Sequence, residues 1–180
     1  LVLPLLGACA VTRAPQTLPA SSAGIEAFSL SGRVAVKVER RGYTASLHWR
    51  HTATGDAVRL FSPLGTVIAE LESDDQGATL TTSDRKVHRA ADVQTLTREI
   101  LGWDLPLAGL RHWVLGRADP SAPIDGEERD ARARLTTLAQ NEWRIVYIEY
   151  AGDSGLPARM ALAHERLSMR LLVDRWDFPQ

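Results

Sequence analysis

Apolar and polar residues alternate along most of the chain from Phe28 onward. This alternation is typical of strands that bury one face. It is strict from Phe28 to Val38, pauses at the turn-forming residues 40–42, and resumes over residues 43–50. The pattern therefore predicts an antiparallel hairpin at the start of the ordered chain.

Further short strands are predicted over residues 57–62, 66–72, 78–82, 85–89, 133–140, 143–150, 158–163 and 167–176. At one place in the chain, the spacing of apolar residues changes from the alternation of a strand to the spacing of a helix. Asp92 is a good N-cap, apolar residues then recur at helical spacing, and Gly102 can end the helix. A second short helix is predicted to carry Leu110, Trp113 and Val114 and to end at Gly116. The charged, proline-containing stretch 117–133 reads as a solvated loop.

About ten short strands at hairpin spacing, broken once by two helices, predict a mainly β fold with a helical insert. We expect an open (incomplete) antiparallel β-barrel or a strongly curved sheet, with the insert covering one open side. The five tryptophans, at positions 49, 103, 113, 143 and 176, fit two arrangements. They either fill the interior of this sheet or line a cavity within it, and the pattern alone does not separate the two.

The composition of the chain excludes several classes of protein. The chain has 180 residues, 44% of them hydrophobic, and a net charge of −1, which predicts one domain with a sizeable core and excludes the basic field of a nucleic-acid-binding protein. A single cysteine excludes disulfides and zinc sites built on several cysteines, and the five histidines have no ligand-like spacing. Because the chain also lacks nucleophile-elbow, phosphate-loop and metalloprotease motifs, we expect no enzyme, no cofactor and no metal.

The first residues have the character of a bacterial lipoprotein signal. Residues 1–8 are apolar and uncharged, and residues 6–9, Leu-Gly-Ala-Cys, match a lipobox, in which the cysteine thiol accepts diacylglycerol. We therefore expect a truncated signal peptide over 1–8, a lipidated Cys9 with a flexible tether over 9–25, and a folded domain over 26–180. Ala10 follows the cysteine where an inner-membrane signal would have Asp. This predicts lipid anchoring in a Gram-negative outer membrane, facing the periplasm.

One tight turn raises a question about surface chemistry. Ser62, Pro63 and Gly65 suit positions i, i+1 and i+3 of a type I turn, which leaves Leu64 at i+2, where a short polar residue is ordinary. Turn chemistry alone allows Leu64 to project from the tip or to fold back under a neighbouring strand.

Several phrases, in one order behind the lipobox, resemble the LolB family. They are SGRVAV, ASLHW, FSPLG, LGWDLPLAGLRHWVLG, NEWRIVYIEY, LPARMAL and LLVDRW, and they extend the resemblance from Cys9 to Trp176. The chain departs from the family in three ways. The segment before the first strand is short for the usual N-terminal helix, Glu142 stands where a glycine would suit a hairpin, and the loop 118–132 is rich in charge.

The resemblance implies an open β-barrel with a helical lid over an apolar cavity. The implied function is that of an outer-membrane lipoprotein receptor, which takes acylated lipoproteins from the periplasmic carrier LolA and passes them to outer-membrane lipid without ATP. We expect such a receptor to be a monomer. The resemblance also places Leu64, with Pro63 and Gly65, in a loop that meets the membrane. For the cavity, the clearest inward positions are Val34, Val36, Leu47, Trp49, Leu60, Leu71, Leu96, Ile100, Leu110, Trp113, Ile145 and Tyr147.

Two other readings of the chain remain at this point. One is an assembly or structural lipoprotein with a solid core that binds a protein partner through an exposed strand edge. The other is a lipid-anchored hydrolase with a triad assembled across strands, although no spacing favours any particular three residues.

Overall fold

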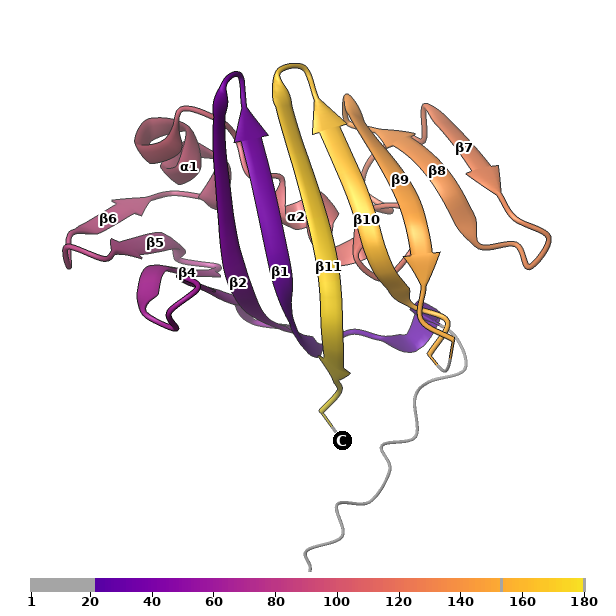
Figure 1. Ribbon diagram of the computed structural model, residues 1–180, viewed down its shortest axis with the longest axis horizontal. Coiled ribbons are helices and arrows are strands. Elements are labelled where there is room, and N and C mark those ends of the chain that lie inside the picture. The colour runs from indigo at the N-terminus through magenta and orange to yellow at the C-terminus, as the bar shows by residue number, and fades with distance from the viewer. Residues whose placement is uncertain (1–21, 153, 180) are drawn as a thin grey trace, which may run out of the picture.

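The structure is a computed structural model that describes residues 22–152 and 154–179. It contains one antiparallel sheet of eleven strands and two helices (Figure 1). The strands are β1 (Phe28–Val38), β2 (Arg41–Thr52), β3 (Gly55–Phe61), β4 (Val67–Asp74), β5 (Gly77–Thr82), β6 (Val87–Ala90), β7 (Gly126–Arg129), β8 (Leu135–Gln140), β9 (Trp143–Tyr150), β10 (Pro157–His164) and β11 (Leu167–Asp177). The helices α1 (Val93–Leu101) and α2 (Leu107–Trp113) separate β6 from β7. Cys9 and the predicted tether up to residue 21 lie outside the described residues.

The sheet curves but does not close. Its strand order is β6-β5-β4-β3-β2-β1-β11-β10-β9-β8-β7, so every neighbour is a hairpin partner except β1 and β11, which pair near the two ends of the chain. The two outermost strands, β6 and β7, do not pair with each other. Figure 1 shows α2 behind the central strands β1 and β11, and α1 to the left of β2, above β5 and β6, with which it is in contact. The predicted open barrel with a helical insert is confirmed.

The strands follow the alternating pattern closely, with two corrections. The first hairpin turns at Glu39 and Arg40, and Arg41 already belongs to β2, because the pairing continues to Val38 opposite Arg41. The stretch 117–133 is not loop throughout, since it contains β7. All four residues of β7 are exposed. An edge strand with no buried face has no alternation of apolar and polar residues, and so β7 could not be predicted from the pattern.

The first helix begins and ends where its capping residues predict. The Asp92 carboxylate accepts a hydrogen bond from the Thr95 backbone N–H at 2.7 Å, which satisfies a free donor of the first turn. Gly102 has a φ of 78° and donates to the Arg98 carbonyl, as at a left-handed helix end. The second helix ends at Trp113, three residues before the predicted Gly116.

The sheet bends where β1 meets β11. The register shifts between Ser31 and Gly32, which marks a β-bulge. A Cβ atom at position 32 would lie 2.1 Å from the Leu172 carbonyl oxygen, so only glycine allows the two strands to approach this closely.

The β8–β9 turn contains the residue that departs from the family pattern. Asn141 and Glu142 both have positive φ, at 53° and 63°, which is the backbone of a two-residue type I′ hairpin turn. Asparagine tolerates this conformation, but glutamate adopts it at a cost of about 1–2 kcal/mol. The tight turn is therefore kept without the expected glycine, and the pairing of Gln140 with Trp143 holds it in place.

Before β1, the described residues contain only one short 3-10 turn, Ser22–Gly24, and no N-terminal helix. Within residues 22–152 and 154–179, neither helix has the length and apolar character needed to cross a bilayer.

Candidate functional site

An apolar cavity of about 290 Å³ lies between the helices and the strands from β11 through β1 to β5. The strands supply inward pairs two residues apart, and α1, α2 and the loop between them close the opposite side. The lining residues are Val34, Val36, Leu47, Trp49, Val58, Leu60, Ile68, Ala69, Leu71, Leu80, Thr82, Thr97, Leu101, Trp103, Leu105, Leu107, Leu110, Val114, Met169 and Leu171. This volume is at the lower end of the range for ligand pockets, which is roughly 300–1,000 Å³.

The polar side-chain atoms of Thr97 and Trp49, two residues of the cavity wall, form hydrogen bonds within the protein. The Thr97 hydroxyl donates to the Val93 carbonyl at 2.8 Å and accepts from the Leu105 N–H at 3.0 Å. The indole N–H of Trp49 donates to the Asp56 carboxylate at 2.8 Å, so that the ring presents carbon to the cavity. Such a wall can bind a hydrocarbon chain and offers little to a polar ligand.

Seven of the twelve predicted cavity residues line this space: Val34, Val36, Leu47, Trp49, Leu60, Leu71 and Leu110. The strand residues among them lie in the most regular alternation of apolar and polar residues in the first half of the chain, and this alternation is the basis on which they were predicted. Whether acyl chains bind there stays a prediction.

The other five, Leu96, Ile100, Trp113, Ile145 and Tyr147, are not in the cavity wall, and for them the prediction of a cavity-lining position is wrong. All of them except the half-buried Ile100 belong to the fully buried core.

For Trp113, Ile145 and Tyr147, the reason is that the end of α2 packs against β8 and β9. The Trp113 indole donates to the buried Gln140 side chain at 2.9 Å, and the Tyr147 hydroxyl donates to the Trp113 carbonyl at 3.1 Å. Burial also raises the pKa of Tyr147, which keeps this hydroxyl protonated as a donor. Trp113 also lies against Trp143, with ring centroids 6.2 Å apart, and Ile145, between Trp143 and Tyr147 on β9, is fully buried. These side chains form core on the β8–β9 side of the sheet, whereas the apolar cavity lies on the side from β11 through β1 to β5.

Thirteen of the lining residues are not among the twelve predicted from the sequence. Val58, Leu80, Met169 and Leu171 lie in alternating runs and could have been named by extending the same rule to β3, β5 and β11. The loop residues Trp103 and Leu105 follow no period, and so only the three-dimensional structure places them at the cavity.

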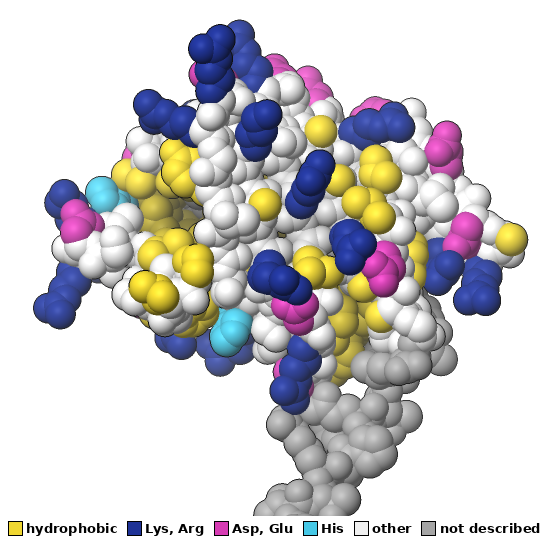
Figure 2. Space-filling model, in the orientation of Figure 1, with side chains coloured by type: hydrophobic (Ala, Val, Ile, Leu, Met, Phe, Trp, Pro, Cys, Tyr) yellow, Lys and Arg dark blue, Asp and Glu magenta, His cyan; other side chains and the backbone are white. Residues whose placement is uncertain are grey.

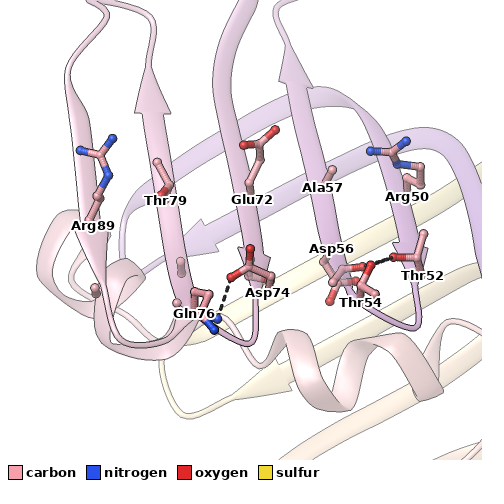
Figure 3. Close-up of a pocket in the computed structure, with 15 residues that line it drawn as sticks. Arg50, Thr52, Thr54, Asp56, Ala57, Glu72, Asp74, Gln76, Thr79 and Arg89 are labelled. Atoms are coloured by element: carbon pink, nitrogen blue, oxygen red, sulfur yellow. Dashed lines mark hydrogen bonds between the residues drawn. The ribbon is translucent and has the colours of Figure 1, made fainter.

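At the other end of the same strands, the surface is polar. A pocket of about 500 Å³ contains Asp56, Asp74 and Gln76 near the β2–β3 and β4–β5 turns, with Arg50 and Arg89 on neighbouring strands (Figure 3). The Asp74 carboxylate accepts from the Gln76 N–H at 2.8 Å, which stabilises the turn. Charged walls of this kind do not suit acyl chains. No group of three or more potential metal ligands occurs among the described residues.

Leu64 projects from the tip of its turn. The Gly65 N–H donates to the Ser62 carbonyl at 2.9 Å, and the Ser62 hydroxyl accepts from the Thr66 N–H at 3.2 Å, so the turn forms as its residues predict. The Leu64 side chain is 93% exposed. The alternative in which it folds back under a strand is therefore wrong.

Among the residues that the structure describes, five of the seven exposed large hydrophobic side chains lie at the Leu64 end of the sheet. These residues, which we call the rim, are Tyr43, Leu64, Val67, Val87 and Leu101. They come from separate elements: the start of β2, the β3–β4 turn, the first residues of β4 and β6, and the last residue of α1. Leu101 also lines the cavity, so the rim adjoins it. Figure 2 shows hydrophobic side chains in a hollow on the left of the molecule, over the region of β2, β4 and α1.

Comparison with known proteins identifies the family of this chain. The family model for the outer membrane lipoprotein LolB matches residues 26–176. The chain belongs to the LolB family. It is 38% identical to the outer-membrane lipoprotein LolB of Nitrosomonas europaea over 155 residues, covering 84% of this chain and 73% of that protein. The corresponding protein of Thiobacillus denitrificans is 34% identical over 175 residues, covering 95% and 91%.

Solved structures show the same fold at low identity. A LolA superfamily protein from Nitrosomonas europaea aligns with a TM-score of 0.50 at 7% identity, covering 87% of this chain and 88% of that one. A DUF1329 family protein from Desulfovibrio piger gives a TM-score of 0.51 at 8% identity, covering 87% of each.

Membership of the LolB family makes this an outer-membrane lipoprotein of the lipoprotein-localisation system, and LolB is a receptor family rather than an enzyme family. The family implies lipoprotein cargo and the LolA carrier in general. An assembly lipoprotein that binds through its strand edge is not favoured.

Proposed function

We propose that the apolar cavity receives the acyl chains of a lipoprotein from the periplasmic carrier LolA and releases them into the outer membrane. The observation that carries this proposal is the composition of the cavity wall. Its strands and helices contribute almost only carbon, and the polar atoms of Thr97 and Trp49 are bonded away from it.

The cargo explains why an enclosed apolar route is needed. A triacylated cysteine has on the order of forty methylenes, and exposing each to water costs about 0.8 kcal/mol. Transfer through water would therefore cost tens of kcal/mol. Passage from the carrier to this cavity and then to the bilayer avoids that cost, and the direction follows if each site binds the chains more strongly than the one before it. A cavity of about 290 Å³ holds only part of such a cargo, so that full loading requires the helical cover to move.

The exposed Leu64 is proposed to bring the rim to the lipid. Burying one leucine contributes roughly 1.5–3 kcal/mol, which is too little to hold a protein on a bilayer. It is enough to orient a protein that a lipid anchor already keeps at the surface. The position of Leu64 on a turn held by three hydrogen bonds supports this role, because the turn presents the side chain without rearrangement.

The anchor itself is proposed to be Cys9, acylated after cleavage before it. Mass spectrometry of the protein extracted from membranes should show an amino-terminal cysteine with the added mass of acyl chains. An unmodified Cys9 in the membrane fraction would contradict the lipobox interpretation.

Delivery can be tested with purified components. A fluorescently labelled lipoprotein bound to LolA is mixed with the protein and phospholipid vesicles, and the label is followed into the vesicles. We expect rapid transfer when the protein is present and none when it is omitted. Label that stays on LolA in both cases would refute the proposed function.

A further inference from the structure

A basic groove of about 940 Å³ lies beside the apolar cavity, at the same end of the sheet as the rim. It is lined by the tips of the β1–β2 and β10–β11 hairpins and by Leu101 and Trp103, which also line the cavity. The surface therefore changes from charged groups at the hairpin tips to the apolar side chains of Leu101 and Trp103 and then to the apolar cavity wall. The groove has four cations, Lys37, Arg40, Arg41 and Arg166, against two carboxylates, Glu39 and Glu165.

Most of this positive charge is not neutralised within the protein. Arg166 pairs with Glu39 at 3.1 Å, and the Glu39 backbone N–H donates to the Arg166 carbonyl, so the two hairpin tips form one platform. In the described part of the chain, Lys37, Arg40 and Arg41 form no ion pair with a carboxylate, and all three are exposed. Figure 2 shows Lys and Arg side chains at the top of the molecule, over the β1–β2 hairpin, in addition to others spread over this face.

We propose that the tip of the β1–β2 hairpin, with Lys37, Arg40, Arg41 and Tyr43, is a docking surface for the anionic phospholipid headgroups of the target bilayer. This inference rests on the proposed function and specifies the lipid on which it acts. Cations near an anionic leaflet attract it, and tyrosine favours the interface between headgroups and chains. Tyr43 is 59% exposed and adjoins the three cations.

The distribution of the rim residues favours a membrane over a protein partner. Tyr43, Leu64, Val67, Val87 and Leu101 are exposed apolar side chains at the end of the sheet that also carries the unpaired cations Lys37, Arg40 and Arg41. Apolar side chains beside unpaired cations match a membrane leaflet, in which anionic headgroups lie next to hydrocarbon. With the rim and the basic tip both on the bilayer, the cavity opens toward lipid.

The test measures binding of the Cys9→Ala chain, which has no anchoring thiol, to vesicles of phosphatidylcholine with and without phosphatidylglycerol. We expect phosphatidylglycerol to strengthen binding, and added salt to weaken it. The Arg40→Gln/Arg41→Gln variant should bind the anionic vesicles roughly thirtyfold more weakly, from about fivefold for each cation. The matched control is Arg50→Gln/Arg89→Gln, which removes the same charge from the wall of the polar pocket, outside the basic groove, and should bind nearly as the parent does.

Three results would overturn the inference. The first is vesicle binding that does not depend on phosphatidylglycerol, and the second is an equal loss of vesicle binding in the two double variants. The third is an Arg40→Gln/Arg41→Gln chain that binds vesicles normally but accepts cargo poorly from the carrier, which would make the surface a protein contact. Failure of the proposed function is a separate result, because it would appear as no delivery by the unsubstituted chain to either type of vesicle.

Discussion

Replacing Ala69 by tryptophan should abolish uptake of acyl chains while leaving the protein folded. Ala69 is on β4 in the cavity wall, opposite Leu60 on β3 and Thr82 on β5. A cavity of 150 Å³ is known to accept benzene, so a cavity of about 290 Å³ has room for an indole ring. The ring would occupy the space in which the chains are proposed to lie.

This substitution should not weaken the fold, because it fills a void instead of overpacking a solid core. We expect a free energy of unfolding equal to that of the parent or higher by about 1 kcal/mol, since filling a cavity commonly stabilises by that order. Uptake is measured by titration with a fluorescent fatty acid. The matched control, Ala57→Trp, introduces the same ring on the neighbouring strand at the polar pocket, and should bind the fatty acid normally. Normal uptake by Ala69→Trp would contradict the cavity assignment.

Replacing Leu64 by glutamate should block delivery to the membrane without affecting acceptance of cargo. The side chain is 93% exposed and lies outside the cavity wall, so neither folding nor fatty-acid binding depends on it. Loss of a buried leucine contact of roughly 1.5–3 kcal/mol reduces the inserted population about tenfold to a hundredfold, and the charge of glutamate opposes insertion further.

Delivery by this variant is compared with that of Ile148→Glu, which places the same charge on an exposed apolar residue of β9 away from the rim. Transfer to vesicles should fall only for Leu64→Glu, and both variants should still remove labelled lipoprotein from the carrier. Equal loss of acceptance and delivery in Leu64→Glu would show that this residue has another role.

Much of the fold could be predicted, because a strand or helix that buries one face has apolar residues at a regular spacing, which is visible in the sequence. The alternation from Phe28 to Val38 follows from burying one face of a strand, and Asp92 and Gly102 follow from the need to cap the two ends of a helix. Both elements form as expected. The strand β7 could not be predicted, since its residues are all exposed and no period remains. The resemblance to LolB added the fold family, which no single period identifies.

The position of the cavity could be predicted only in part. Leu47 and Ile145 both face inward on well-patterned strands, yet Leu47 borders empty space and Ile145 lies in solid core. The difference comes from α2, whose Trp113 is held by Gln140 against β8 and β9. Alternation identifies the inner face of a strand, but what covers that face is set by contacts between residues distant in sequence. For the same reason, turn chemistry left the direction of Leu64 open.

The most direct test of the cavity is quenching of tryptophan emission by a fatty acid brominated along its chain. Trp103 lines the cavity, and Trp143 is in the solid core on the other side of the barrel. Saturable quenching is predicted, which Trp103→Phe reduces, Trp143→Phe preserves and Ala69→Trp abolishes. Quenching that is absent, or that is unaffected by Trp103→Phe and Ala69→Trp, would show that acyl chains do not enter this cavity.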